Sequence, residues 1–177
     1  MIDLILGGAR SGKSRLAEQI AEKTGLEVIY IATAQAHDSE MQDRIEHHRQ
    51  QRPSHWQVVE EPLYLSKIIQ DYDQPHGVIL VDCLTLWMSN LLLHEDPHFY
   101  EQEIEKLYTC LPKLKAHIIL VSNETGLGVV PLGHLTRQFV DESGRLHQNL
   151  GKIAHRVQFC VAGFPIQLKG NESCNGG

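Results

Sequence analysis

The sequence predicts a single α/β domain with a mainly parallel sheet, helices on both faces and an antiparallel edge strand near the C-terminus. Short apolar runs alternate along the chain with segments of helical periodicity. Most of these runs are apolar at consecutive positions, which is typical of strands that helices cover on both faces. The length of 177 residues suits one domain. We expect residues 1–169 to form this domain and residues 170–177, rich in Gly, Asn and Ser, to be a disordered tail.

The elements follow from these patterns in chain order. Strands are predicted at residues 2–6, 27–32, 78–82, 117–122 and 157–162, and a turn at 163–165 leads to an edge strand at 166–168. Helices are predicted at residues 13–23, 38–51, 62–72, 85–93, 97–111 and 132–155. Pro62 suits a first helical turn, whereas Pro53 ends the helix before it. Gly144 marks a point where the last helix can break.

Composition and charge disfavour several classes of function. Sixteen Lys and Arg against 22 Asp and Glu give a net charge of −6, and nucleic-acid-binding surfaces are normally basic. Cys83, Cys110, Cys160 and Cys174 form no C-x-x-C pair, which argues against a zinc knuckle or a disulfide framework. No segment has the pattern of a signal peptide or reaches ~18 uninterrupted apolar residues. We therefore expect a cytoplasmic protein with no membrane span and no nucleic-acid partner.

The most specific motif lies between the first predicted strand and the first predicted helix. Residues 7–14 read GGARSGKS and fit G-x-x-x-x-G-K-[ST], the phosphate-binding loop or P-loop. In such a loop backbone N–H groups surround phosphate oxygens, and the next helix directs its positive end at the same anion. The candidate nucleotide-binding residues here are Gly7, Gly8, Ala9, Arg10, Ser11, Gly12, Lys13 and Ser14. The sequence therefore predicts a single-domain P-loop nucleotide-binding fold, and an ordinary glycine-rich turn is the weaker alternative.

Two oxygen-bearing side chains are candidates for binding Mg²⁺. Ser14 is the last residue of the P-loop, and Asp82 closes the apolar strand 78–82. A carboxylate at the end of a neighbouring strand is what a Mg²⁺–triphosphate complex needs. The alternative is that Asp82 caps the following helix, because Asp is a favoured N-cap residue. The N-K-x-D motif that reads guanine in switch GTPases is absent.

A second unusual segment, residues 38–53, contains paired histidines. On a helix, Arg44 lies three residues from His47 and four from His48, and Arg52 lies four beyond His48. Imidazole and guanidinium groups on one face can hold a phosphate, and an unprotonated imidazole can attack an α-phosphorus to form a phosphoramidate. Taken alone, the segment fits a solvated charged helix face better. Spacing does not say which histidine acts.

Taken together, several segments in one order resemble a known family. These are GGARSGKS, IATAQ, E-M-x-x-R-I-x-x-H-H, R-P-S-H-W, the strand ending at Asp82 and SNETGLGVVP. They are similar to the bifunctional adenosylcobinamide kinase/adenosylcobinamide-phosphate guanylyltransferase family of cobalamin biosynthesis. The resemblance runs from residue 1 to about residue 169. The P-loop is generic, but the His-His helix followed by R-P-x-H-W and the N-E-x-G-x-G-x-V-P loop are specific to that family.

The resemblance implies two reactions and their reactive groups. The first phosphorylates the aminopropanol hydroxyl of adenosylcobinamide with ATP or GTP, and the second transfers GMP from GTP to that phosphate, which gives adenosylcobinamide-GDP and pyrophosphate. It implies that His47 carries GMP, that Lys13 is catalytic in the kinase step and that Mg²⁺ accompanies the nucleotide. The nucleotide contacts that it implies beyond the P-loop are Ala32, Thr33, Ala34, Arg49, Gln50, Gln51, Arg52, Glu60 and Asp82. Some members have Glu at the Asp82 position, and either carboxylate can hold Mg²⁺.

The resemblance also implies a small-molecule corrinoid substrate and a homo-oligomer, which in similar proteins is a propeller-like trimer. No general base for the kinase step stands out, since phosphoryl transfer depends chiefly on positioning and charge neutralisation. Glu124 follows a strand where open α/β sheets bind ligands, so it is a candidate for the corrinoid side. The alternative is a plain turn built on Gly126 and Gly128. A single-activity P-loop kinase and a nucleotide-switched binding protein remain as alternative functions.

Overall fold

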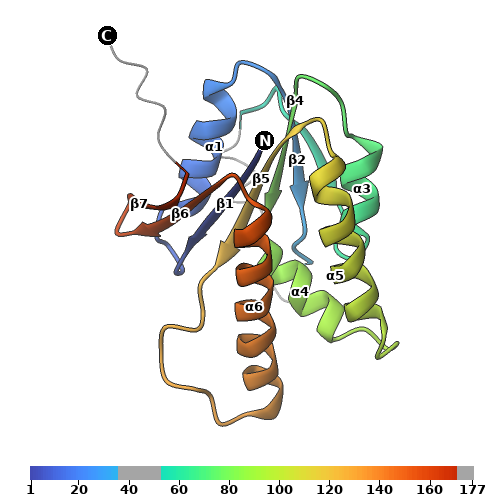
Figure 1. Ribbon diagram of the computed structural model, residues 1–177, viewed down its shortest axis with the longest axis vertical. Coiled ribbons are helices and arrows are strands. Elements are labelled where there is room, and N and C mark those ends of the chain that lie inside the picture. Colours follow the sequence, from blue (N-terminus) through green and yellow to red (C-terminus); the bar gives the residue numbers. More distant parts are fainter. Residues whose placement is uncertain (36–52, 171–177) are drawn as a thin grey trace.

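A computed structural model describes residues 1–35 and 53–170 of the chain. Its elements, drawn in Figure 1, are β1 (Ile2–Gly7), α1 (Lys13–Lys23), β2 (Glu27–Ala32), β3 (Gln57–Glu60), α3 (Leu65–Asp71), β4 (Gly77–Asp82), α4 (Leu84–Leu92), α5 (Phe99–Cys110), the short 3-10 helix η1 (Leu111–Lys113), β5 (His117–Asn123), α6 (His134–Ile153), β6 (Arg156–Val161) and β7 (Phe164–Lys169). The predicted helix at residues 38–51 and the predicted tail, apart from Gly170, lie outside the described residues.

The strands form one seven-stranded sheet with the order β3-β2-β4-β5-β1-β6-β7. The first six strands pair in parallel, and β7 pairs antiparallel with β6 at the edge. Parallel neighbours need long crossover connections, which the helices supply. In Figure 1 the parallel strands run downwards, so their carboxyl ends gather at the lower edge of the sheet. The predicted α/β class, the parallel sheet and the antiparallel edge strand are confirmed.

Side chains that alternate along the inner strands fill two separate cores. Leu4 and Ile31 belong to a core shared with α3, α4, α5 and α6, whose largest buried side chain is Trp87. The intervening Ile5 and Tyr30 belong to a second core shared with α1. Figure 1 shows α5 and α6 in front of the sheet and α1 behind it. The alternation follows from the two-residue period of a strand, and it explains why these runs are apolar at every position.

Three local features differ from what the sequence indicated. The edge strand β3 was not predicted, because Gln57–Glu60 is short, mostly exposed and without an apolar run. The last helix continues through Gly144, since Leu146 and Leu150 bury its face and a glycine in a helix costs only about 0.5–1 kcal/mol. The helix predicted to begin at Pro62 begins at Leu65. Residues 62–64 lie before it, where the carboxylate of Glu61 accepts hydrogen bonds from the N–H groups of Leu63 and Tyr64.

Two further features bear on the functional reading. No helix within residues 1–35 and 53–170 is long and apolar enough to cross a membrane. Cys83, Cys110 and Cys160 are buried free thiols, and Cys174 lies outside the described residues. Burial raises the pKa of the Cys83 thiol to about 11, so this thiol beside Asp82 stays protonated at neutral pH.

Candidate functional site

The P-loop joins the end of β1 to the start of α1, and close approach requires glycine at two of its positions. Gly12 has φ of 93°, and a Cβ there would lie 3.1 Å from the Cα of Gly163 in the β6–β7 turn. A Cβ at Gly7 would lie 2.7 Å from the backbone carbonyl oxygen of Cys160 on β6. The same turn braces the loop, because the N–H of Gly163 donates to the carbonyl of Ser11 at 2.9 Å. The motif glycines are therefore set by the geometry of the loop.

The charged groups of the loop surround a cavity of about 580 Å³ at the start of α1. Its lining is Arg10, Ser11, Gly12, Lys13, Ser14, Arg15 and Glu18. Lys13 is only 9% exposed, and its Nζ donates to the carbonyl of Gly8 at 3.2 Å, so the ammonium folds back over the loop. The first turn of α1 carries no acidic residue. The positive helix end, Lys13 and the buried Oγ of Ser11, which has no hydrogen-bond partner among the described residues, suit a phosphate group.

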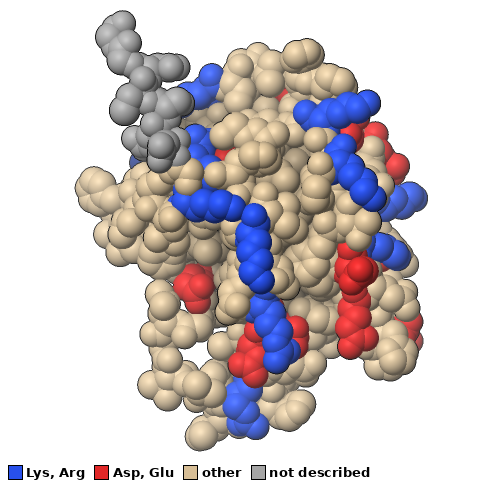
Figure 2. All heavy atoms as spheres, viewed as in Figure 1, with Lys and Arg blue, Asp and Glu red and all other residues tan. Residues whose placement is uncertain are grey.

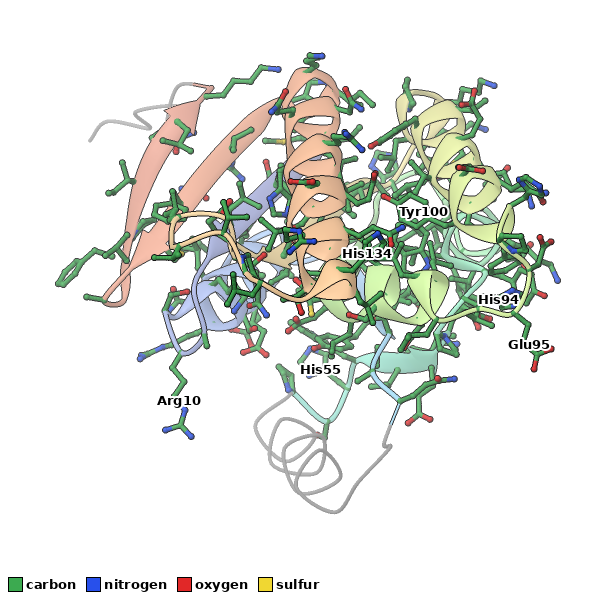
Figure 3. All side chains as sticks on the ribbon, turned by 90° about the horizontal axis from the view of Figure 1, so that it is seen from below. Arg10, His55, His94, Glu95, Tyr100 and His134 are labelled. Atoms are coloured by element: carbon green, nitrogen blue, oxygen red, sulfur yellow. The ribbon has the colours of Figure 1, made fainter. Side chains whose placement is uncertain are left out.

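Figure 3 views the molecule from the end where the parallel strands terminate. Arg10 projects away from the body of the protein at this end, and it adopts a positive φ of 57°. His55 and His134 lie at the same end, one from the segment before β3 and the other from the start of α6. The P-loop, the segment before β3 and the start of α6 therefore lie at the same edge of the sheet.

Asp82 is the last residue of β4, two strands away from β1. Tyr30 contacts its carboxylate, and Trp56 packs against Tyr30. The hydroxyl of Tyr30 donates to Oδ2 of Asp82 at 3.0 Å. The ring of Tyr30 in turn stacks on Trp56, with centroids 6.4 Å apart and planes 28° apart. Trp56 is 6% exposed, so the tryptophan of the R-P-S-H-W segment supports the site from the second core. Sequence reasoning missed Tyr30, whose apolar neighbours on β2 give no sign of a polar role.

The predicted nucleotide contacts at the end of β2 divide into different environments. Thr33 is fully buried; its hydroxyl donates to the carbonyl of Cys83 at 2.7 Å and accepts the Cys83 N–H at 3.0 Å. Thr33 therefore fastens β2 to β4, and its side chain is not open to a ligand. Ala32 stands in register with Asp82 on one side and Glu60 on the other, which aligns the ends of three strands. Ala34 is half-buried and Glu60 is exposed.

The two predicted Mg²⁺ ligands offer suitable donors. Ser14 is half-buried at the second position of α1, and Asp82 is half-buried with Oδ2 engaged by Tyr30. Hydroxyl and carboxylate oxygens suit Mg²⁺, which is usually bound by one or two such groups together with substrate phosphates and water. In the described part of the chain no group of three or more His, Cys, Asp or Glu side chains forms a self-sufficient metal site. The donor set therefore fits a Mg²⁺ ion that arrives with a nucleotide.

Several predicted residues lie outside the described ranges. These are His47, Arg49, Gln50, Gln51 and Arg52. The flanking segments are described: β2 ends at Ala32, and Trp56 and β3 follow Pro53. In the chain, residues 36–52 follow the carboxyl end of β2 and precede the start of β3.

The chain matches one family along nearly its whole length. The family model described as "Cobinamide kinase / cobinamide phosphate guanyltransferase" matches residues 3–168. A relative in Pseudomonas aeruginosa, named bifunctional adenosylcobalamin biosynthesis protein CobP, is 58% identical over 170 residues, which cover 96% of this chain and 98% of the relative. A relative in Escherichia coli, named bifunctional adenosylcobalamin biosynthesis protein CobU, is 40% identical over 182 residues, which cover 96% of this chain and all of the relative.

Solved structures show the same fold at low identity. A Pyrococcus horikoshii OT3 protein, known from a structural study, has a TM-score of 0.58 with 9% identity and covers 97% of this chain and 87% of its own. The RadB recombinase has a TM-score of 0.52 with 14% identity, over 89% of this chain and 73% of its own. These likenesses concern the fold alone.

Proposed function

The chain belongs to the cobinamide kinase / cobinamide phosphate guanyltransferase family, and from this premise we propose how its residues carry out the two reactions. It is a bifunctional kinase and guanylyltransferase of adenosylcobalamin biosynthesis that uses nucleotide co-substrates. The observation that carries the proposal is the P-loop at the head of α1, where Lys13 folds back on Gly8 at 3.2 Å above a cavity suited to phosphate.

The kinase step uses the P-loop to position ATP or GTP. We propose that the backbone N–H groups of residues 8–14 and the ammonium of Lys13 hold the β- and γ-phosphates. The aminopropanol oxygen of adenosylcobinamide attacks the γ-phosphorus, and the bond to the β–γ bridging oxygen breaks. Ser14 and Asp82 would hold Mg²⁺, which neutralises charge on the phosphate oxygens when it is bound. Tyr30 keeps the Asp82 carboxylate aimed at this edge of the sheet.

The guanylyl step proceeds through a covalent nucleotide on His47. An imidazole nitrogen of His47 attacks the α-phosphorus of GTP, and pyrophosphate leaves as the α–β phosphoanhydride bond breaks. A phosphate oxygen of adenosylcobinamide phosphate then attacks the same phosphorus, and the P–N bond breaks to release adenosylcobinamide-GDP. The family resemblance supports this role, and in the chain the segment that contains His47 follows the carboxyl end of β2.

The remaining nucleotide contacts are proposed on the same side of the sheet. Ala32, Ala34 and Glu60 are supported by the alignment of the β2, β3 and β4 ends. Thr33 contributes by fastening these ends through Cys83. The contacts proposed within residues 36–52 are Arg49, Gln50, Gln51 and Arg52, whose charges and amides suit the phosphates and base of GTP.

We also propose a cytoplasmic homo-oligomer that acts on a corrinoid. Both nucleoside triphosphates are cytoplasmic, and buried free thiols are typical of reducing compartments. Phe164 and Ile166 alternate along β7, so they share one face, and each is more than half exposed, as is Leu168 at the β-bulge of this strand. An exposed apolar row of this kind on an edge strand suits contact with a second copy.

The test is a stepwise assay of purified protein with adenosylcobinamide. With ATP and Mg²⁺ alone the product expected by mass spectrometry is adenosylcobinamide phosphate; addition of GTP converts it to adenosylcobinamide-GDP with release of pyrophosphate. Lys13→Ala should lose the first product, whereas supplied adenosylcobinamide phosphate should still be guanylylated by this variant if GMP transfer relies on His47. Phosphorylation without any guanylylation by the wild type would leave a single-activity kinase, and formation of neither product would contradict both reactions.

A further inference from the structure

Glu124 lies directly beside the P-loop. It follows Asn123, the last residue of β5, which stands opposite Gly7 in the parallel register. The N–H of Glu124 donates to the carbonyl of Gly7 at 3.0 Å, so the backbone of Glu124 is fixed to the first residue of the phosphate loop. About a fifth of its side chain, 21%, remains exposed. The carboxylate is therefore both anchored and accessible at the edge of the sheet where the nucleotide is proposed to bind.

Both oxygens of the Glu124 carboxylate have neighbours that limit its motion. Oε1 accepts the N–H of Gly126 at 2.6 Å. Oε2 lies 3.4 Å from Nδ1 of His147 on α6, a residue whose side chain is only 7% exposed. Each carboxylate oxygen has two lone pairs, so these contacts leave capacity to accept a proton from a ligand.

A chain of hydroxyl groups lies behind His147. Thr85 Oγ1 accepts the N–H of Asn123 at 2.6 Å, and its own hydrogen is then available to Ser122 Oγ at 3.2 Å. Ser122 Oγ lies 2.8 Å from Nε2 of His147. If Nε2 accepts from Ser122, the hydrogen of the neutral ring lies on Nδ1, which is 3.4 Å from the Glu124 carboxylate and has no hydrogen-bond partner among the described residues. Burial lowers the pKa of His147 although Glu124 opposes this, which keeps the ring neutral.

The surroundings distinguish Glu124 from Asp82 and Glu60, the other two acidic residues proposed at this edge. The Asp82 carboxylate accepts a hydrogen bond from Tyr30 and is proposed to bind Mg²⁺. Glu60 lies on β3, the edge strand on the opposite side of the sheet from β6 and β7, and three strands separate it from β1. Glu124 is the only charged residue between Asn123 and His134. Figure 2 shows the segment between β5 and α6, at the lower left, almost wholly as uncharged atoms. Leu127, Val129 and Leu132 in this segment are at least 80% exposed, so a partly apolar substrate can lie against it.

We propose that Glu124 is the general base of the kinase step and that His147 is its positioning residue; this inference rests on the proposed function. As the aminopropanol oxygen forms its bond to the γ-phosphorus, its hydrogen passes to a carboxylate oxygen of Glu124, and the nucleoside diphosphate leaves with the bridging-oxygen electrons. The Nδ1–H dipole of His147, 3.4 Å from Oε2, attracts the carboxylate electrostatically and so favours one orientation of Glu124. The guanylyl step needs no such base, because its acceptor is already a phosphate anion.

The experiment compares both activities in four variants of Glu124 and His147 and in one control variant. The kinase step is followed with adenosylcobinamide and γ-labelled ATP, and the guanylyl step with supplied adenosylcobinamide phosphate and GTP. Glu124→Gln should lower the kinase kcat by about 10²–10⁴-fold, the usual contribution of a general base, while the KM for ATP and the rate of guanylyl transfer stay within about twofold. Glu124→Asp should recover part of the kinase kcat. Glu142→Gln is the matched control, since Glu142 is 20% exposed and pairs with Arg145 away from the P-loop.

The positioning role has its own pair of variants. His147→Leu should lower the kinase kcat and spare guanylyl transfer, and His147→Asn, which keeps an N–H near the Nδ1 position, should restore most of it. An unchanged kinase kcat in Glu124→Gln would overturn the inference. It would also be overturned if Glu124→Gln and His147→Leu each lost the kinase and guanylyl activities to the same extent. A wild type without kinase activity would instead contradict the proposed function itself.

Discussion

The hydroxyl of Tyr30 on β2 donates a 3.0 Å hydrogen bond to Oδ2 of Asp82 on β4, although the Tyr30 side chain is only 1% exposed. The two strands are neighbours in the sheet, and Ala32, two residues after Tyr30, stands opposite Asp82 in their register. One buried aromatic residue therefore connects the second core to the proposed metal-binding carboxylate. Trp56 stacks on Tyr30 and extends this connection to the segment just before β3.

Tyr30→Phe removes this hydrogen bond and keeps the ring. We expect the Mg²⁺ concentration for half-maximal kinase activity to rise several-fold, because Asp82 loses the group that orients it. We expect a loss of about 1 kcal/mol in the free energy of unfolding, the usual net value of one hydrogen bond. Mg²⁺ titration of the kinase rate and urea denaturation measure the two effects. Tyr72→Phe, which removes an exposed hydroxyl that accepts from Gln57, is the control and should leave the Mg²⁺ requirement unchanged.

Gly12→Ala should abolish nucleotide binding at the P-loop. The φ of 93° and the 3.1 Å approach to the Cα of Gly163 leave no room for a Cβ without moving the loop or the β6–β7 turn. Isothermal titration with ATP and Mg²⁺ measures the loss. In contrast, Gly144→Ala adds a Cβ in open space within α6 and should raise the free energy of unfolding by about 0.5–1 kcal/mol. Normal ATP affinity in Gly12→Ala would contradict the loop geometry.

Asp3 makes stability depend on acid pH. It is 1% exposed; burial alone would raise its pKa, but hydrogen bonds with His117 and Arg156 outweigh burial and hold the pKa below its ordinary value. A lowered folded-state pKa stabilises the protein above the unfolded pKa of about 4, and this contribution disappears as pH falls through the folded value. Urea denaturation between pH 7 and pH 3 should show this decline.

Asp3→Asn should remove that decline and reduce stability at pH 7. The loss should be roughly 3 kcal/mol, the lower end for breaking a buried ion pair, because Arg156 is 22% exposed and is partly solvated when unpaired. His98→Asn, at an exposed pair with Glu101, is a control that should change little. An equally steep acid decline in Asp3→Asn would assign the pH dependence to other groups.

The apolar face of β7 gives a prediction about assembly. Light scattering should find the wild type as a homo-oligomer, and Ile166→Glu should shift it towards the monomer, because a charge would be buried in the proposed contact. Gln167→Glu places the same charge on the other face of β7 and should leave the mass unchanged. A monomeric wild type would contradict the proposed contact.

The site could be predicted from sequence only where its residues are contiguous. The P-loop is eight adjacent residues between a strand and a helix, so its position could be predicted directly, and its phosphate-binding role stays a prediction. Asp82 was predicted from one apolar run. Tyr30, by contrast, lies 52 residues from its partner, and His147 lies 25 residues from Ser122; only the sheet order and the placement of α6 bring these pairs together.

The same reasoning applies to the fold. Strands buried on both faces have long apolar runs and were predicted almost to the residue, whereas β3 owes its existence to pairing with β2 rather than to its own sequence. Gly144 was interpreted as a break because local propensity is visible in a sequence, but the packing of Leu146 and Leu150 that keeps α6 continuous is not.

The most direct test of the two-reaction account is to incubate the protein with Mg²⁺ and GTP labelled at either the α- or the γ-phosphate, and to count acid-labile, base-stable label after denaturation. The account predicts protein-bound label from α-labelled GTP only, its absence in His47→Ala, its retention in His48→Ala, and its discharge by adenosylcobinamide phosphate. No label from either position, or equal α-label in His47→Ala, would contradict the covalent histidine–GMP route.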